Sequence, residues 1–223
     1  MKIFIFYLCF IFFADTFGLY PIWAYYDNYE TLPFLKDSPL HRNFWLYNIL
    51  SAVNYLVVGQ LFVGQLKKLK KYNFKKILYW FLVLFGVYSI ICFSTFGEFL
   101  YAYDMSILLI GTFLVLFCII AYFFEILLSD RILNFRSDAL FYFAVAILVW
   151  HLCVTPIEIY TSFFNTSNPN FINLHATVLR YANIFMYSMF VLGFYIDYRY
   201  RLNSIKNSKT SPTDPGRKVF ISR

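Results

Sequence analysis

Five long apolar segments dominate this chain of 223 residues. They occupy residues 44–66, 77–97, 105–128, 139–157 and 173–197. Each is close to the ~20 residues that a helix needs to cross a hydrocarbon core. Backbone polar groups inside lipid must be satisfied within their own segment, and the runs lack the alternating pattern of barrel strands. The sequence therefore predicts an all-α, polytopic transmembrane helical bundle over residues 44–200.

The composition excludes a water-soluble domain. Hydrophobic residues make up 61% of the chain and charged residues only 14%, which leaves too few polar side chains to cover a water-facing surface. The net charge of +7 is concentrated in short clusters between the apolar segments. Since this distribution is typical of cytoplasmic loops, we expect the membrane lipid bilayer as the partner and no nucleic acid.

The connections between the apolar segments predict one orientation. Three stretches carry the basic residues: 67–76, 129–138 and the tail 201–223. Two connections contain no Lys or Arg: 98–104 and 158–172. The positive-inside rule places the first group, including the C-terminus, in the cytoplasm, and applies equally to a bacterial inner membrane and to eukaryotic endomembranes. The polar, proline-containing tail is expected to be disordered.

The N-terminal region leaves two readings open. Residues 1–18 combine Lys2 with an apolar run, which suits either a cleaved signal peptide or an N-terminal anchor. An anchor that continues toward Tyr26 has to tolerate Asp15 and Pro21. Residues 19–43 are aromatic and contain three prolines, so we expect an extracytoplasmic segment without a long helix. The bundle accordingly has five or six spans.

Several ionisable residues fall in the outer half of the predicted bundle. They are Glu98, Asp104, His151, Glu158, His175 and Arg180. Ionisable groups at membrane depth are costly and indicate function by default. We expect His151 and His175 at similar depth on adjacent antiparallel helices. With a carboxylate such as Glu98 they could bind zinc, alone they could hold a haem, or each could be a structural histidine bonded to a neighbour.

Arg180 also has two interpretations. It can form a structural ion pair with Asp104 or Glu98, or it can bind a lipid phosphate or carboxylate bidentately. Glu125 is expected at the cytoplasmic interface. The triplet 165–167 is an N-glycosylation acceptor in a predicted outer loop.

Three fragments carry a resemblance to a family of membrane hydrolases. Residues 48–59 contain Asn, Ser, Tyr and Gly at the positions of that family's first helix motif. In the second fragment Ser89 is followed at the family's spacing by Asp104. The third fragment, 174–179, begins with a Leu-His pair. Together they resemble the alkaline ceramidase and adiponectin-receptor superfamily.

That resemblance implies a zinc site and a lipid amide as substrate. It assigns His175 as a zinc ligand and Ser89 and Asp104 as catalytic residues, with His151 and Glu98 recruited as further ligands. The chain departs from the family at Phe93 and Leu179, where the family has zinc-binding histidines, and in its number of helices. Two functions follow: a divergent ceramidase-like hydrolase that acts on membrane lipids or only binds them, or a non-catalytic accessory or scaffold protein of a larger assembly.

Overall fold

The computed structural model describes residues 2–36, 38–67, 69, 73–95, 97–133, 135–163 and 168–210. These residues form helices joined by turns and short 3₁₀ segments, and no strand occurs in the described ranges. Within them, six helical stretches are long and apolar enough to cross a membrane. The predicted all-α polytopic bundle is confirmed, and the number of candidate spans is six.

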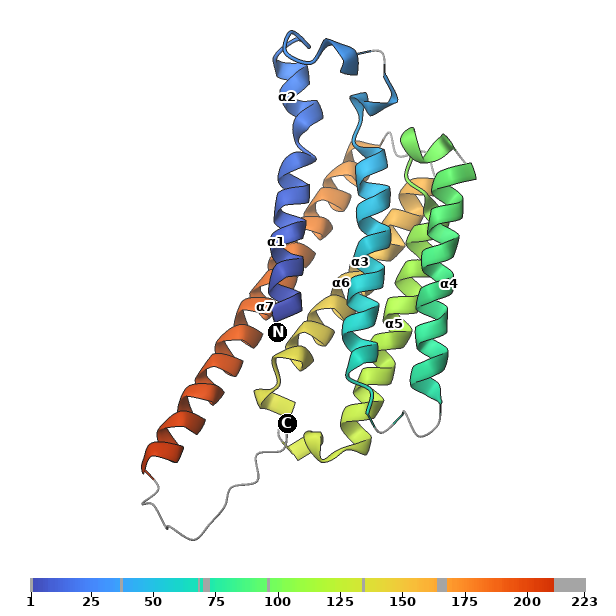
Figure 1. The fold of residues 1–223 in the computed structure, drawn as a ribbon. Helices are drawn as coiled ribbons and strands as arrows, with labels where there is room; N and C mark the ends of the chain where they lie inside the picture. Colours follow the sequence, from blue (N-terminus) through green and yellow to red (C-terminus); the bar gives the residue numbers. More distant parts are fainter. Residues whose placement is uncertain are drawn as a thin grey trace.

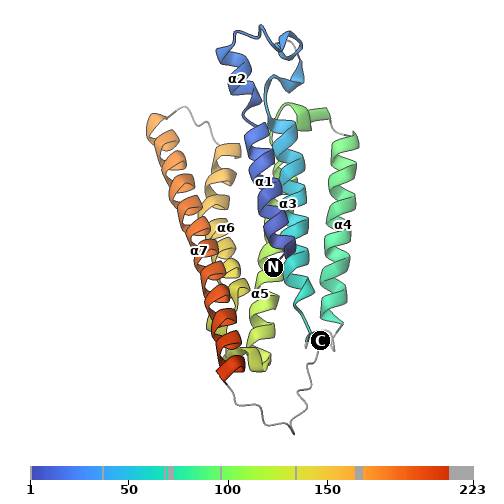
Figure 2. The ribbon, with the colours of Figure 1, turned by 60° about the vertical axis from the view of Figure 1, so that its left-hand side comes forward.

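The main helices run alongside one another and give the molecule an elongated shape (Figures 1 and 2). They are α1 (Lys2–Phe17), α2 (Tyr20–Tyr26), α3 (Phe44–Gly64), α4 (Phe74–Thr95), α5 (Met105–Leu128), α6 (Ala139–Phe163) and α7 (Pro169–Thr210). Each of the five predicted apolar segments coincides with one helix from α3 to α7. Helix α5 has the predicted bounds, α3 and α4 each end two residues before the predicted end, and α6 and α7 extend further than predicted, most of all α7.

Helix α5 forms the centre of the bundle, because it contacts α3, α4 and α6, while α7 packs along α6. Close approach of these helices depends on small residues. A Cβ atom added to Gly111 of α5 would lie 2.1 Å from the ring of Tyr55 on α3. A Cβ atom added to Gly193 of α7 would lie 2.9 Å from the ring of Phe143 on α6. Both glycines therefore let an aromatic ring pack directly against a helix backbone.

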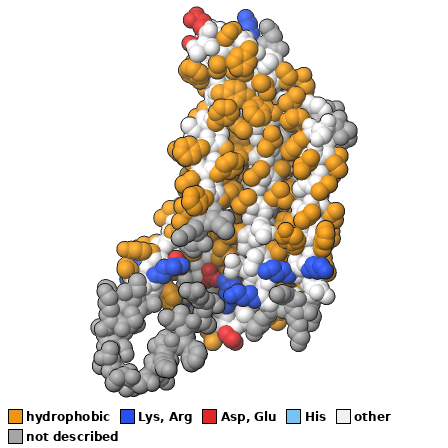
Figure 3. All heavy atoms as spheres, viewed as in Figure 1, with side chains coloured by type: hydrophobic (Ala, Val, Ile, Leu, Met, Phe, Trp, Pro, Cys, Tyr) orange, Lys and Arg blue, Asp and Glu red, His pale blue; other side chains and the backbone are white. Residues whose placement is uncertain are grey.

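The two ends of the bundle differ in charge. We call one the basic end: it carries Lys67, Lys75, Lys76, Arg131 and Arg136. Figure 3 shows Lys and Arg side chains gathered near this end, below a broad hydrophobic surface. The opposite end is formed by α2, by the 3₁₀ turn Gly97–Leu100 and by the start of α7 (Figure 1).

Glu125, which we expected at the interface, is instead buried at the basic end, with only 1% of its surface exposed. Its carboxylate accepts hydrogen bonds from the backbone amides of Lys67, at 2.9 Å, and Leu69, at 3.0 Å. A carboxylate shared by two amides is a strong, charge-assisted arrangement. Glu125 therefore anchors the start of the lysine-rich connection to α5.

The N-terminal span crosses the boundary that we predicted between residues 18 and 19. Helices α1 and α2 together form one apolar stretch, Phe4–Tyr26. Pro21 lies in the first turn of α2, where a missing backbone amide costs no helical hydrogen bond. Pro33 and Pro39 likewise open two short 3₁₀ turns, Pro33–Leu35 and Pro39–His41. The predicted segment 19–43 thus begins with the helical residues Tyr20–Tyr26, and in its described part beyond Tyr26 the structure has only these short turns.

Helix α1 is bound to the rest of the bundle through a few specific contacts. Phe4 is 2% exposed and its ring lies 4.5 Å from that of Phe143 and 5.3 Å from that of Phe190. The hydroxyl of Tyr7 donates a hydrogen bond to Asn54 Oδ1 on α3. The amide of Asn43 donates to the carbonyl of Gly18 at 2.9 Å. These contacts hold the first two turns of α1 and the residue that follows its end, Gly18, against the bundle.

Helix α7 continues through residues 201–210, the first part of the predicted tail. The disorder of the tail stays a prediction. In its exposed part Arg201 Nε donates to Asp197 Oδ2 at 2.8 Å, one helical turn away. Residues 211–223 lie outside the described ranges, as does the glycosylation triplet 165–167.

Candidate functional site

A partly open cavity, which we call the polar cavity for the polar side chains in its lining, lies between α1, α3, α5, α6 and α7. Its volume is about 330 Å³. One part of its wall is apolar, with Phe4, Val58, Val115, Ile147 and Phe190. The other part carries polar groups from four helices: Tyr7, Asp15, Tyr47, Ser51, Asn54, Tyr55, Trp150, His151, Asn183 and Tyr187. So many polar side chains at membrane depth identify this cavity as the candidate site.

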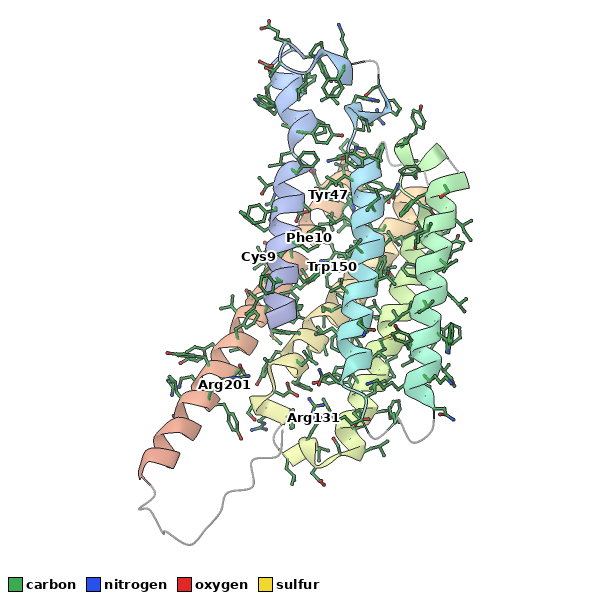
Figure 4. All side chains as sticks on the ribbon, viewed as in Figure 1. Cys9, Phe10, Tyr47, Arg131, Trp150 and Arg201 are labelled. Atoms are coloured by element: carbon green, nitrogen blue, oxygen red, sulfur yellow. The ribbon has the colours of Figure 1, made fainter. Side chains whose placement is uncertain are left out.

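Two hydrogen bonds tie pairs of helices together at the cavity wall. Trp150 Nε1 on α6 donates to Asn183 Oδ1 on α7 at 2.7 Å. Tyr7 on α1 donates to Asn54 on α3. Figure 4 shows Tyr47 and Trp150 in the region between α1, α3 and α6. Because each bond spans two helices, the wall is held in place by the bundle and does not depend on a loop.

His151 belongs to a buried chain of polar groups. Its Nδ1 lies 3.5 Å from Thr112 Oγ1, which in turn lies 3.2 Å from the hydroxyl of Tyr55. The imidazole is 4% exposed and its ring centroid is 5.8 Å from that of Tyr55. The chain joins α6, α5 and α3, and two of its members, His151 and Tyr55, line the cavity. His151 thus has a neighbouring side chain as partner, as in the structural interpretation of this residue.

Asp15 brings a carboxylate to the same cavity from α1. Among the described residues its side chain has no hydrogen bond and no ion pair. It lies close enough to Tyr7, Tyr47 and Tyr187 for electrostatic interaction with their hydroxyl groups. Asp15 therefore faces a space lined by aromatic hydroxyls.

An apolar groove opens beside the cavity, between α1 and α7. Its volume is about 540 Å³, and it is lined largely by Ile11, Phe12, Leu19, Val191 and Phe194. Cavity and groove have six lining residues in common: Leu8, Ile11, Asp15, Tyr47, Tyr187 and Phe190. The polar cavity is thus adjacent to a groove on the outer, lipid-facing side of the bundle.

Asp104, one of the two predicted catalytic residues, caps α5. Its Oδ1 accepts hydrogen bonds from the amides of Ser106, at 2.9 Å, and Ile107, at 3.2 Å. It also lines a separate cavity of about 380 Å³ at the end of the bundle opposite the basic end, together with Tyr103. Burial raises the pKa of the Tyr103 hydroxyl, which is therefore neutral at physiological pH. The N-cap role accounts for an Asp at this position.

Ser89, the other predicted catalytic residue, is buried within α4. Its hydroxyl donates to the carbonyl of Phe85 in the preceding helical turn, at 2.9 Å. It is not among the residues that line the cavity next to Asp104. Such a bond to the residue four positions earlier is a common way for Ser to satisfy its hydroxyl inside a helix.

The predicted histidine ligands do not share a depth. His175 Nε2 lies 3.1 Å from Glu158 Oε1, and its ring stacks on Phe171. Glu158 follows His151 by seven residues on α6, which corresponds to roughly 10 Å along a helix. The helices are adjacent, as expected, but the two imidazoles have different partners. They differ in depth because His175 pairs with a residue near the end of α6.

Within the described residues, no group of three or more His, Cys, Asp or Glu side chains could hold a metal ion. His151, His175 and Asp104 each have another partner, and the side chain of Glu98 lies outside the described residues. A catalytic zinc needs three protein ligands. The residues found together here do not fit that requirement.

Arg180 is exposed on the surface of α7. In the described part of the chain it forms no ion pair with Asp104, which caps α5. The other acid considered as its partner, Glu98, has its side chain outside the described residues. Its binding of a lipid head group stays a prediction.

Of the polar residues that line the cavity, the sequence predicted only His151 as a site residue and missed, among others, Asp15, Asn54, Trp150 and Asn183. A signal was available for Asp15, Asn54 and Asn183, since Asp and Asn are rare inside apolar spans and each of these three lies well within one. What sequence periodicity did not reveal is that they face one another.

Comparison with protein-family models, with curated proteins and with solved structures finds no match for this chain. The resemblance to the ceramidase and adiponectin-receptor superfamily accordingly stays a prediction, and the function is argued from the geometry of the site.

Proposed function

We propose that this integral membrane protein binds one amphipathic molecule of the lipid class. Its polar group occupies the cavity and its hydrocarbon chain lies in the groove between α1 and α7. The observation that carries the proposal is the contact between a polar cavity and an apolar groove through the same lining residues. In an amphipathic ligand a polar head is joined to an apolar tail, in the same way as the polar cavity is joined to the apolar groove.

The dimensions and the lining support this proposal. A cavity of about 330 Å³ lies within the usual range for small-molecule sites, and the groove adds about 540 Å³. Asn54, Asn183 and Ser51 offer hydrogen-bonding groups to a polar head. Inside a bilayer such groups are satisfied by water or by a ligand, and a lipid can reach them without leaving the membrane.

The proposal belongs to the non-catalytic class of functions considered from the sequence. Hydrolysis of a lipid amide by zinc requires a ligand set that the described residues do not assemble. Binding requires only the cavity, the groove and a route from the bilayer. This is compatible with an accessory membrane protein.

Photo-crosslinking in vesicles tests the proposal. The probes are octadecyl chains with a diazirine in the chain and an amine, an amide or a carboxylate as head group. For at least one head group we expect saturable labelling of peptides from α1 and α7 that line the groove. An excess of the same molecule without the diazirine should reduce the labelling by competition.

Two variants test whether the labelled site is the cavity. Ser51→Phe fills the cavity without removing a hydrogen bond found among the described residues, so we expect it to abolish saturable labelling. Ser94→Phe makes the same change on the exposed face of α4 and should leave labelling unchanged. Equal labelling of both variants, or labelling of wild type that no competitor reduces for any head group, contradicts the proposal.

A further inference from the structure

The charge inside the proposed binding site is unbalanced. Asp15 is the single carboxylate among the residues that line the cavity and the groove, and it lines both. Neither lining contains a Lys or an Arg among the described residues. Besides the tyrosines, the other ionisable group is His151, which lines the cavity and lies 3.5 Å through its Nδ1 from Thr112 Oγ1. The site therefore presents negative charge and no fixed positive charge.

The position of Asp15 inside a span makes an unpaired negative charge energetically unfavourable. It lies in the middle of the candidate span Phe4–Tyr26, where ionised side chains normally pair with an opposite charge or with ordered polar groups. Its carboxylate has neither an ion pair nor a hydrogen bond within the described ranges. A carboxylate at this depth is stabilised when a cation occupies the space beside it.

The surroundings of Asp15 suit an organic cation. Tyr47 and Tyr187 line both cavity and groove with it, and Trp150 lines the cavity. Aromatic faces attract ammonium groups through their quadrupoles, and tyrosine hydroxyls accept hydrogen bonds from them. A carboxylate surrounded by several aromatic side chains is thus chemically complementary to an alkylammonium group.

Asp15 also lies at the position where the polar head of a bound ligand would end and its hydrocarbon tail would begin. It belongs to the six residues shared by cavity and groove, whereas Asn54 and Asn183 line the cavity and Phe12 and Val191 the groove. A cationic centre at Asp15 leaves the hydrocarbon chain free to follow the groove. Further hydrogen-bonding groups of the head can reach the asparagines.

We propose that the ligand of this site is a cationic amphiphile, with a long-chain amine as the minimal example, and that Asp15 is its counter-ion. This inference rests on the proposed function, because it names the class of amphiphile that the site selects. Anionic lipids with a single carboxylate head are disfavoured, because they would bring a second negative charge next to Asp15.

Competition binding in nanodiscs tests the inference on the full chain. The probe is tritiated octadecylamine, and the competitors are unlabelled octadecylamine, N-octadecylacetamide, stearate and butylamine. We expect octadecylamine to compete best, the neutral acetamide more weakly and stearate least. Butylamine separates a small soluble amine from an amphiphile: competition by butylamine equal to that of octadecylamine would assign the site to the soluble amine and overturn the inference.

The variant Asp15→Asn keeps the size of the side chain and removes its charge. We expect it to weaken octadecylamine binding by ~10- to 100-fold, the usual effect of losing a charge-assisted hydrogen bond, and to leave N-octadecylacetamide binding unchanged. Asp27→Asn is the matched control, since Asp27 lies beyond the span and accepts a hydrogen bond from the amide of Thr31. It should bind octadecylamine like the wild type.

The outcomes separate the two proposals. If octadecylamine and N-octadecylacetamide bind equally to wild type and to Asp15→Asn, the site takes amphiphiles but does not select a cation, and only the inference on charge fails. If none of the long-chain molecules binds saturably, the proposed function fails. If the Asp15→Asn variant does not fold, the order of the competitors on wild type still decides the question.

Discussion

Asn48 illustrates how a single buried amide holds one end of this bundle together. Its Nδ2 donates to the carbonyls of Phe99 and Ala102, each at 2.8 Å, and its Oδ1 accepts from the amide of Asp104 at 2.9 Å. The side chain is almost completely buried, and it satisfies three backbone groups in the connection between α4 and α5. The position of Asp104 as the cap of α5 thus depends on a residue of α3.

Replacing Asn48 by Leu should destabilise the protein markedly. The change leaves two carbonyls and one amide without their partner, and each buried unsatisfied group costs about 1–3 kcal/mol. We expect the free energy of unfolding to fall by at least ~2 kcal/mol in an SDS titration in mixed micelles. Asn173→Leu, an equivalent change on the exposed surface of α7, should have little effect. Equal losses in the two variants would refute the role assigned to Asn48.

For single residues, the sequence predicts whether a polar side chain lies inside or beside a span better than it predicts the partner of that side chain. Asp104, His151 and His175 were singled out correctly as polar groups inside or beside spans. Their partners could not be read, because hydropathy indicates the depth of a residue but not the direction in which its side chain leaves the helix. The pairing of His175 with Glu158 and the capping by Asp104 depend on that direction.

Helix α1 is the element whose status matters most for the site. It contributes Tyr7 and Asp15 to the lining of the cavity, and it forms one wall of the groove. A mature protein without α1 would therefore have neither the complete cavity nor the groove. Its contacts with Phe143, Phe190 and Asn54 are those of an integral span. Of the two interpretations of the N-terminal segment, we propose that α1 is a retained anchor.

The Phe4→Ala variant tests this interpretation. Phe4 is 2% exposed and packs among aromatic rings, whereas Phe6 on the same helix is 75% exposed. We expect Phe4→Ala to lower the free energy of unfolding by about 3 kcal/mol and Phe6→Ala to lower it much less. Melting of the detergent-solubilised variants and their intact mass would be measured together. A mass that lacks α1, or no difference between the variants, would count against retention.

The contact between α3 and α5 gives a second test at the level of helices. A methyl group at Gly111 would collide with the Tyr55 ring near its attachment to the chain, which cannot swing aside easily. We expect Gly111→Ala to cost about 1–3 kcal/mol, the usual penalty of overpacking. At Gly64 no atom lies within 4 Å of an added Cβ, so Gly64→Ala serves as control. Comparable stability of both variants, measured by SDS titration, would show that the helices are not packed this closely.

Five of the six spans follow from the sequence because lipid imposes one length and one secondary structure on them. The sixth was obscured by Asp15 and Pro21, which read as interruptions of an apolar run. The structure accounts for both residues: Pro21 lies in the first turn of α2, and Asp15 lies where the cavity and the groove meet. Both explanations depend on where each residue lies in the folded bundle, and the periodicity of the sequence does not predict this.

For the whole molecule, the charge asymmetry predicts the orientation in the membrane. The basic end should face the cytoplasm, and α2 with the turn Gly97–Leu100 should face the other side. Single cysteines at Lys76 and at Asn28, in a background without the native cysteines, would be treated with a membrane-impermeant maleimide. We expect labelling at residue 28 in intact cells and at residue 76 only after permeabilisation. The reverse pattern would invert the orientation.

The central claim is that the cavity between α1, α3, α5, α6 and α7 holds one amphiphile. Native mass spectrometry of protein released from membranes measures this most directly. The account predicts one bound molecule per chain in wild type and in Ser94→Phe, and none in Ser51→Phe. Wild-type protein without any bound molecule, even after incubation with octadecylamine and N-octadecylacetamide, or Ser51→Phe with the same bound mass as wild type, would contradict it.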